Sequence, residues 1–137
     1  MKQTIHKFLL LAVMAIMGIT NAEAYTCCID GIYYNVDKNK KTAGVTYRTG
    51  NMDMNDEGAY SGSVVIPENI VYEGVKYPVT RIAGWAFKQC FYLESLTIPS
   101  SVTSIGKGAF YYCRNLTSIT IPENMKSIED STFGNCI

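Results

Sequence analysis

The sequence predicts a repeat solenoid made of short parallel β-strands and helical turns, preceded by a β-rich N-terminal cap. Three observations support this prediction. One segment recurs at a constant spacing, each copy holds a short β-rich stretch that ends at a proline, and the region upstream alternates apolar and polar residues. The 137 residues, with 12 basic and 12 acidic side chains and 47% hydrophobic residues, suit one ordinary domain and exclude a disordered chain.

Residues 1–24 have the pattern of an export signal. Lys2 and Lys7 form a basic start, residues 8–19 form an apolar core, and residues 22–24 supply the small-x-small cleavage pattern. The uncharged run of residues 8–22 is shorter than the about 20 residues that a membrane-crossing helix needs. We therefore expect cleavage after Ala24, a secreted or cell-surface protein, and no membrane span after cleavage. An uncleaved anchor is the alternative.

Loss of the signal also removes His6, the only histidine of the chain. Ser-His-Asp and Cys-His nucleophiles need an imidazole, and so does histidine-ligated zinc. The zero formal net charge leaves no basic surface for phosphates. We therefore expect no enzyme activity, no catalytic residue and no nucleic-acid partner.

The repeat is visible when the chain is aligned with itself. Residues 82–104 match residues 105–127 at 10 of 23 positions, and a third copy begins at Ile128. A period of about 20 to 29 residues with recurring Leu and Ile is typical of a leucine-rich solenoid. The copies stack the same side chains, which predicts a core ladder of Ile82, Ile105, Ile128, Phe87, Phe110, Phe133, Cys90, Cys113 and Cys136.

Each copy divides into a strand and a return segment. The sequence predicts strands over residues 95–98 and 118–121, each ended by the following proline, which lacks a backbone donor. Parallel stacking would place Leu96 and Ile98 above Ile119 and Ile121 in the core, with Thr97 above Thr120 facing water. Residues 84–90 and 107–113 are expected to return the chain as helical turns whose Ala and Phe side chains point inward.

The region before the full copies predicts a cap. Alternating stretches over residues 32–36 and 42–48 surround a lysine-rich turn, and a second pair of stretches surrounds Glu73-Gly74, so both predict hairpins. A half-copy begins near Val64, where residues 66–69 repeat as residues 121–124. We expect a signal over residues 1–24, a β-rich cap over residues 25–80 and about two and a half repeats over residues 81–137.

The motifs resemble a known family. The pattern Leu-x-x-Leu-x-Ile-Pro, followed by Val-Thr-Ser-Ile-Gly-x-x-Ala-Phe-x-x-Cys, is similar to the BspA-like class of bacterial leucine-rich repeats and covers about residues 64–136. The resemblance implies an exported or surface-attached protein that mediates adhesion to host proteins or other cells. Such members usually carry more repeats, so a truncated structural fragment without binding activity of its own is the alternative function.

Cysteine and metal sites have simple interpretations. Cys90, Cys113 and Cys136 recur at one repeat position, where a buried thiol packs as a small hydrophobe, so we expect free thiols there. Cys27 and Cys28 either cross-link chains or bridge elsewhere. Residues 53–58 copy the start of a calcium-binding loop, but Val64 stands where a bidentate glutamate is required, so we expect neither metal nor cofactor.

Aromatic side chains are the one feature that favours a ligand surface. Phe91, Tyr92, Tyr111 and Tyr112 stand at positions where neighbouring copies carry polar residues, so some of these rings should be exposed. The predicted contact surface comprises Trp85, Tyr92, Tyr111 and Tyr112, because large, rigid and amphipathic rings suit contact with a protein or a carbohydrate. The alternative is partial burial of the same rings against the next repeat. The predicted function is binding or adhesion at the cell surface.

Overall fold

The computed structural model describes residues 25–48 and 60–136, and within them the chain forms ten β-strands and no helix. The predicted export signal and the acidic loop of residues 53–58 lie outside the described residues. The strands are β1 (Cys27–Ile29), β2 (Ile32–Asp37), β3 (Thr42–Val45), β4 (Gly62–Val65), β5 (Asn69–Tyr72), β6 (Val75–Ile82), β7 (Leu93–Thr97), β8 (Ser104–Ile105), β9 (Ser118–Thr120) and β10 (Ser127–Ile128).

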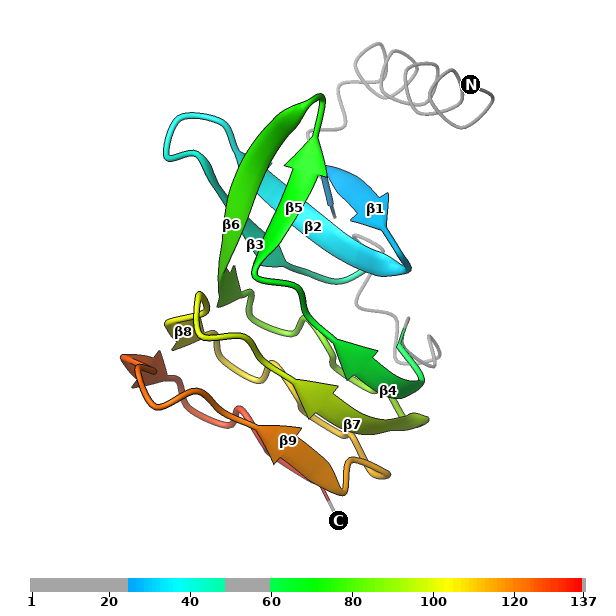
Figure 1. Cartoon of the computed structure of the whole chain (residues 1–137). Helices are drawn as coiled ribbons and strands as arrows, with labels where there is room; N and C mark the ends of the chain where they lie inside the picture. The colour runs from blue at the N-terminus through cyan, green and yellow to red at the C-terminus, as the bar shows by residue number, and fades with distance from the viewer. Residues whose placement is uncertain (1–24, 49–59, 137) are drawn as a thin grey trace, which may run out of the picture.

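Two sheets organise these strands. One has seven strands in the order β1-β2-β3-β6-β8-β10, with β5 paired to β6, and the other has three in the order β4-β7-β9. In Figure 1, β4, β7 and β9 lie one below another, and the cap strands stand at one end of this stack. The repeats thus form coils, and successive coils add strands to both sheets: β8 and β10 to the larger one, β7 and β9 to the smaller one.

Both predicted hairpins are present. β2 and β3 are antiparallel, and the Asp37 carboxylate closes their turn by accepting hydrogen bonds from the backbone N–H of Asn39 and of Lys40, at 3.0 and 2.9 Å. β5 and β6 are antiparallel around Glu73 and Gly74, whose φ angles of 51° and 76° match the left-handed geometry of a tight hairpin turn. Local turn chemistry therefore sets both hairpins.

Strand β6 joins the cap to the repeats. Its first residues pair with β5, while Arg81 and Ile82 pair both with β3 and with β8. The seven-stranded sheet therefore runs without a break from the cap hairpin into the repeat coils. A boundary near residue 80 falls inside this strand.

The repeat strands stack in parallel, one repeat length apart. Leu96 pairs with Ile119 and Thr97 with Thr120, which is the register that the repeat predicts. Leu96 and Ile98 are buried, whereas Ile121 is 37% exposed. The placement of Ile121 in the core was wrong, because no coil covers it within the described residues.

The return segments are not helical. Trp85, Phe87 and Gln89 donate their backbone N–H to Lys107, Ala109 and Tyr111 of the next coil, at 3.1, 2.8 and 2.8 Å. The intervening N–H groups close short turns, as from Ala86 to Ala83. In an α-helix each backbone N–H bonds a carbonyl of the preceding turn. Because these N–H groups bond carbonyls of the next coil instead, the segment does not form a helix. The predicted helical turns are thus successive tight turns.

The core lies between the two sheets and the return segments. Phe87 stacks on Phe110 with ring centroids 5.2 Å apart, and Phe110 stacks on Phe133 at the same distance. Ile82 and Ile105 are fully buried, but Ile128 and Phe133 on the last described coil are 45% and 38% exposed, so these two members of the predicted core ladder stack in its row without being buried. Equivalent side chains form one elongated row, covered at the cap end and open at the other end of the described residues.

Candidate functional site

The return segments form one surface of the repeats, here called the turn face, which comprises residues 84–92, 107–115 and 130–136. Its backbone repeats along with its sequence. Left-handed φ angles occur at equivalent positions of successive copies, namely Trp85 and Gln89, Gly108 and Tyr112, and Ser131 and Asn135. This conformation is rare for bulky residues, so Trp85 and Tyr112 are aromatic residues held in a strained backbone by their neighbours.

Trp85 lies over the next coil. A Cβ atom added at Gly108 would lie 2.2 Å from a Trp85 ring carbon, so the indole packs directly on this glycine. Gly108 also has a φ of 61°, which only glycine adopts at little cost. The pair explains why a tryptophan in one coil is followed by glycine at the same position of the next.

Tyr111 repeats this arrangement one coil further on. A Cβ atom added at Gly134 would lie 2.7 Å from the Tyr111 ring. The ring of Tyr111 meets Trp85 edge to face at 5.7 Å and Tyr112 edge to face at 4.7 Å, measured between centroids. The structure thus brings Trp85, Tyr111 and Tyr112 together as one half-buried cluster.

Tyr92 lies at the end of a return segment, away from this cluster. It is 56% exposed and precedes β7, where its backbone carbonyl accepts a hydrogen bond from Gly62 of β4 at 2.6 Å. No ring contact joins it to the cluster in the described part of the chain. Three of the four predicted contact residues are therefore neighbours, and the fourth marks a separate corner.

Cations complete the turn face. The Lys88 ammonium lies 5.9 Å from the centroid of Trp85, and the Arg114 guanidinium lies 5.4 and 5.7 Å from the centroids of Tyr112 and Phe91. Phe91, Lys88 and Arg114 were not among the predicted contact residues. The repeat alignment carries the signal, because Phe91 and Arg114 occupy one position of successive coils, and Lys88 and Tyr111 occupy another. We call Trp85, Lys88, Phe91, Tyr111, Tyr112 and Arg114 the aromatic–cation patch.

The cysteine row belongs to the core. Cys113 donates its thiol hydrogen to the Phe87 carbonyl at 2.9 Å, and Cys136 donates to the Phe110 carbonyl at 3.0 Å. Burial raises the pKa of both thiols above the ordinary value near 9. Thiols held neutral in this way pack and hydrogen-bond, and they do not act as nucleophiles. Cys28, by contrast, is exposed on β1.

Metal-binding and membrane-crossing features are absent from the part of the chain that the structure describes. No group of three or more His, Cys, Asp or Glu side chains is placed to hold a metal ion among residues 25–48 and 60–136. No helix in the same ranges is long and apolar enough to cross a bilayer.

The stacked coils, the parallel strand ladders and the Phe row define a leucine-rich repeat protein. Residues 63–137, more than half of the chain, match the family model of the BspA type leucine-rich repeat region (6 copies). The chain therefore belongs to the BspA type leucine-rich repeat family, as the sequence motifs predicted. Membership indicates a protein-interaction role, and the fold is typically a non-enzymatic scaffold.

Solved structures of bacterial leucine-rich repeat proteins are similar to this chain. A protein from Bacteroides ovatus is 34% identical with a TM-score of 0.66, and the match covers 82% of this chain and 27% of that one. The Treponema pallidum leucine-rich repeat protein is 27% identical with a TM-score of 0.63, and the match covers 82% of this chain and 46% of that one. A leucine-rich cell surface protein from Faecalibacterium prausnitzii is 31% identical with a TM-score of 0.62, and the match covers 82% of this chain and 28% of that one.

This chain spans less than half the length of those three structures. No curated relative matches it significantly.

Proposed function

We propose that this chain is a secreted or cell-surface adhesion protein that binds a partner through its aromatic–cation patch. The observation that carries the proposal is the clustering of Trp85, Tyr111 and Tyr112 with Lys88 and Arg114 on the turn face. Aromatic and arginine side chains dominate protein interfaces energetically. Family membership supports the proposal, because it gives this cluster a scaffold suited to protein interaction.

A protein partner fits the patch better than a carbohydrate does. Stacking on a sugar ring uses the open face of an aromatic side chain, but Trp85 has Gly108 against its ring and the Lys88 ammonium near it. Tyr112 likewise has the Arg114 guanidinium near its ring. What remains is a mixed surface of ring edges, hydroxyls and positive charge, which complements acidic and apolar groups of a protein. Glycan binding is the other outcome of the test.

The repeat itself supplies substitutions that preserve the backbone. Tyr112 occupies a left-handed position where the next copy has Asn135, and the residue equivalent to Tyr111 in the preceding copy is Lys88. Tyr112→Asn and Tyr111→Lys therefore remove aromatic surface with residues that the same position already accommodates. Asparagine is also favoured at positive φ, so Tyr112→Asn should not strain the backbone, and urea unfolding of the double variant reports whether the fold is retained.

The experiment measures binding of the purified protein to immobilised extracellular-matrix proteins and to a glycan array. We expect saturable binding to a matrix protein that falls about tenfold or more in the Tyr111→Lys/Tyr112→Asn variant. Val71→Ala, which alters an exposed side chain of β5, is the matched control and should bind like wild type. Equal binding by the double variant, or binding to glycans alone, would contradict the proposed protein-binding patch.

A further inference from the structure

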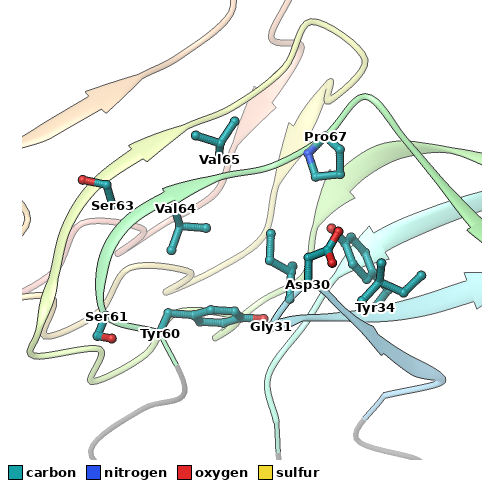
Figure 2. Close-up of a pocket in the computed structure, with 11 residues that line it drawn as sticks. Asp30, Gly31, Tyr34, Tyr60, Ser61, Ser63, Val64, Val65 and Pro67 are labelled. Carbon is teal, nitrogen blue, oxygen red and sulfur yellow. The ribbon is translucent and has the colours of Figure 1, made fainter.

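A groove separates β4 from the turn between β1 and β2 (Figure 2). Its volume is about 440 Å³. Ser63, Val64 and Val65 of β4 line one wall, and Asp30 and Gly31 of the turn line the opposite wall. This groove lies between the cap and the first repeat strand and contains no residue of the aromatic–cation patch.

The β4 wall is a free strand edge. Within the described residues β4 pairs only with β7. On that side Gly62 donates its N–H to the Tyr92 carbonyl at 2.6 Å, and Ile66, directly after β4, donates its N–H to the Thr97 carbonyl at 3.1 Å. Successive residues of a strand direct their main-chain groups to opposite edges. The N–H and C=O groups of Ser63 and Val65 therefore face away from β7, toward the groove. Such an edge is a template for another strand.

The length of the free edge suits one short strand. The edge from Ser63 to Val65 is three residues long, or about 10 Å at the rise of a β-strand. The Asp30–Gly31 turn closes the opposite wall, so a second copy of the chain, which would bring a whole sheet, does not fit.

The charge of the groove favours a basic occupant. Asp30 is exposed at its rim, and its backbone is fixed in the left-handed turn with Gly31. The two ion pairs recorded in the described residues, Lys38–Glu73 and Lys40–Asp37, do not involve Asp30. Its carboxylate is therefore available to a cation, and Val64 and Val65 of β4 add apolar groups to the lining of the groove.

We propose that this groove binds an extended segment of a partner protein, which pairs with β4 as an added strand and carries a lysine or arginine opposite Asp30. Main-chain hydrogen bonds to Ser63 and Val65 would provide affinity, and Asp30 would provide selectivity. The groove is a second site, so this proposal does not depend on the aromatic–cation patch.

Two variants of β4 isolate the main-chain contribution. Val65→Pro removes the N–H that faces the groove while sparing every hydrogen bond to β7, because proline is tolerated at a free strand edge. Val65→Thr is the matched control, since threonine keeps the N–H and already occupies the equivalent positions Thr97 and Thr120. Urea unfolding of each variant reports whether the fold is retained.

The experiment selects binders from random heptapeptides displayed on phage, using the purified protein, and then measures synthetic copies of the selected peptides by fluorescence anisotropy. We expect peptides with a lysine or arginine that bind wild type and Val65→Thr equally, and Val65→Pro about tenfold or more weakly. Asp30→Asn should weaken the same peptides severalfold at low salt and less at high salt.

Several results would overturn the proposal. They are the absence of any enriched peptide, equal binding to a folded Val65→Pro variant, and a selected pool without basic residues. The Tyr111→Lys/Tyr112→Asn variant should bind the peptides like wild type. Loss of peptide binding in that variant would place the peptides on the turn face and would also refute the groove.

Discussion

Replacement of Gly108 by alanine probes how the coils pack on the turn face. The backbone φ of 61° disfavours any side chain, and the new Cβ would lie 2.2 Å from one Trp85 ring carbon and 2.5 Å from another. Two separate costs follow. Alanine in the left-handed region costs about 1–2 kcal/mol, and displacement of a packed ring costs about 1–3 kcal/mol. We expect Gly108→Ala to lower the free energy of unfolding by about 2–5 kcal/mol.

Two controls separate these costs. Gly74 has a φ of 76° with nothing within 4 Å of an added Cβ, so Gly74→Ala should show the backbone cost alone, about 1–2 kcal/mol. In a Trp85→Gly background the ring is gone, and Gly108→Ala should then cost no more than Gly74→Ala. Glycine is the residue that the next copy has at this position, and it relieves the left-handed strain at Trp85.

The assay is urea unfolding followed by far-ultraviolet circular dichroism, with the slope m compared between variants to show that the same surface is exposed. Equal destabilisation by Gly108→Ala and Gly74→Ala would show that the indole does not resist the added Cβ. An unchanged cost of Gly108→Ala after removal of the indole would show that the collision is not with Trp85.

Three further predictions concern buried polar groups. Cys28 should react with a thiol reagent in the folded protein, whereas Cys113 should react only in denaturant, because burial raises its pKa and its thiol is hydrogen-bonded; equal labelling rates would contradict this. Tyr60→Phe should lower the free energy of unfolding by about 2 kcal/mol, measured in urea, because the Tyr60 hydroxyl donates to the Thr46 carbonyl at 2.7 Å and accepts from the Tyr33 N–H at 3.1 Å. Burial raises the pKa of Tyr34 above its ordinary value near 10, so the folded protein keeps a proton that the unfolded chain releases. The free energy of unfolding, measured in urea at a series of pH values, should therefore fall as the pH rises above 10. The Tyr34→Phe variant should show a shallower fall.

The proposed groove and patch would give the molecule two different ways to bind. The patch would contact its partner through side chains, so the partner would be recognised by its shape and charge. The groove offers main-chain donors and acceptors at a strand edge, so its partner must be extended. The two sites use different residues on different segments, and each can be removed by substitutions that leave the other intact.

Local features of the fold were predictable from the chain because they depend on neighbours in sequence. The constant repeat length sets the stacking of Leu96 on Ile119, since coils of equal length place equivalent residues side by side. The turn at residues 37–41 follows from Asp37, whose carboxylate binds the next backbone N–H groups. The turn at Glu73 and Gly74 follows from the conformations that these residues adopt.

The contents of the candidate site were predicted in part. The aromatic residues were visible as departures from the repeat, and the structure places Trp85, Tyr111 and Tyr112 in one cluster. The separation of Tyr92 was not visible, because Tyr92 follows the last tight turn and its backbone binds β4. The cations were overlooked because the repeat shows where Lys88 and Arg114 stand but not that their side chains turn toward the rings of Trp85 and Tyr112.

By itself, the amino-acid order determined the period, the strand register and the two hairpin turns, all of which arise from identical coil length or from contacts within a few residues. Tertiary structure alone decided the rest. Backbone N–H groups of Trp85 and Phe87 bind the next coil, which replaces the predicted helical turns. The groove arises where a cap turn at Asp30 meets a strand at Ser63, and no shared period relates these two segments. Their proximity follows from how the cap packs on the first coil, which only the folded chain specifies.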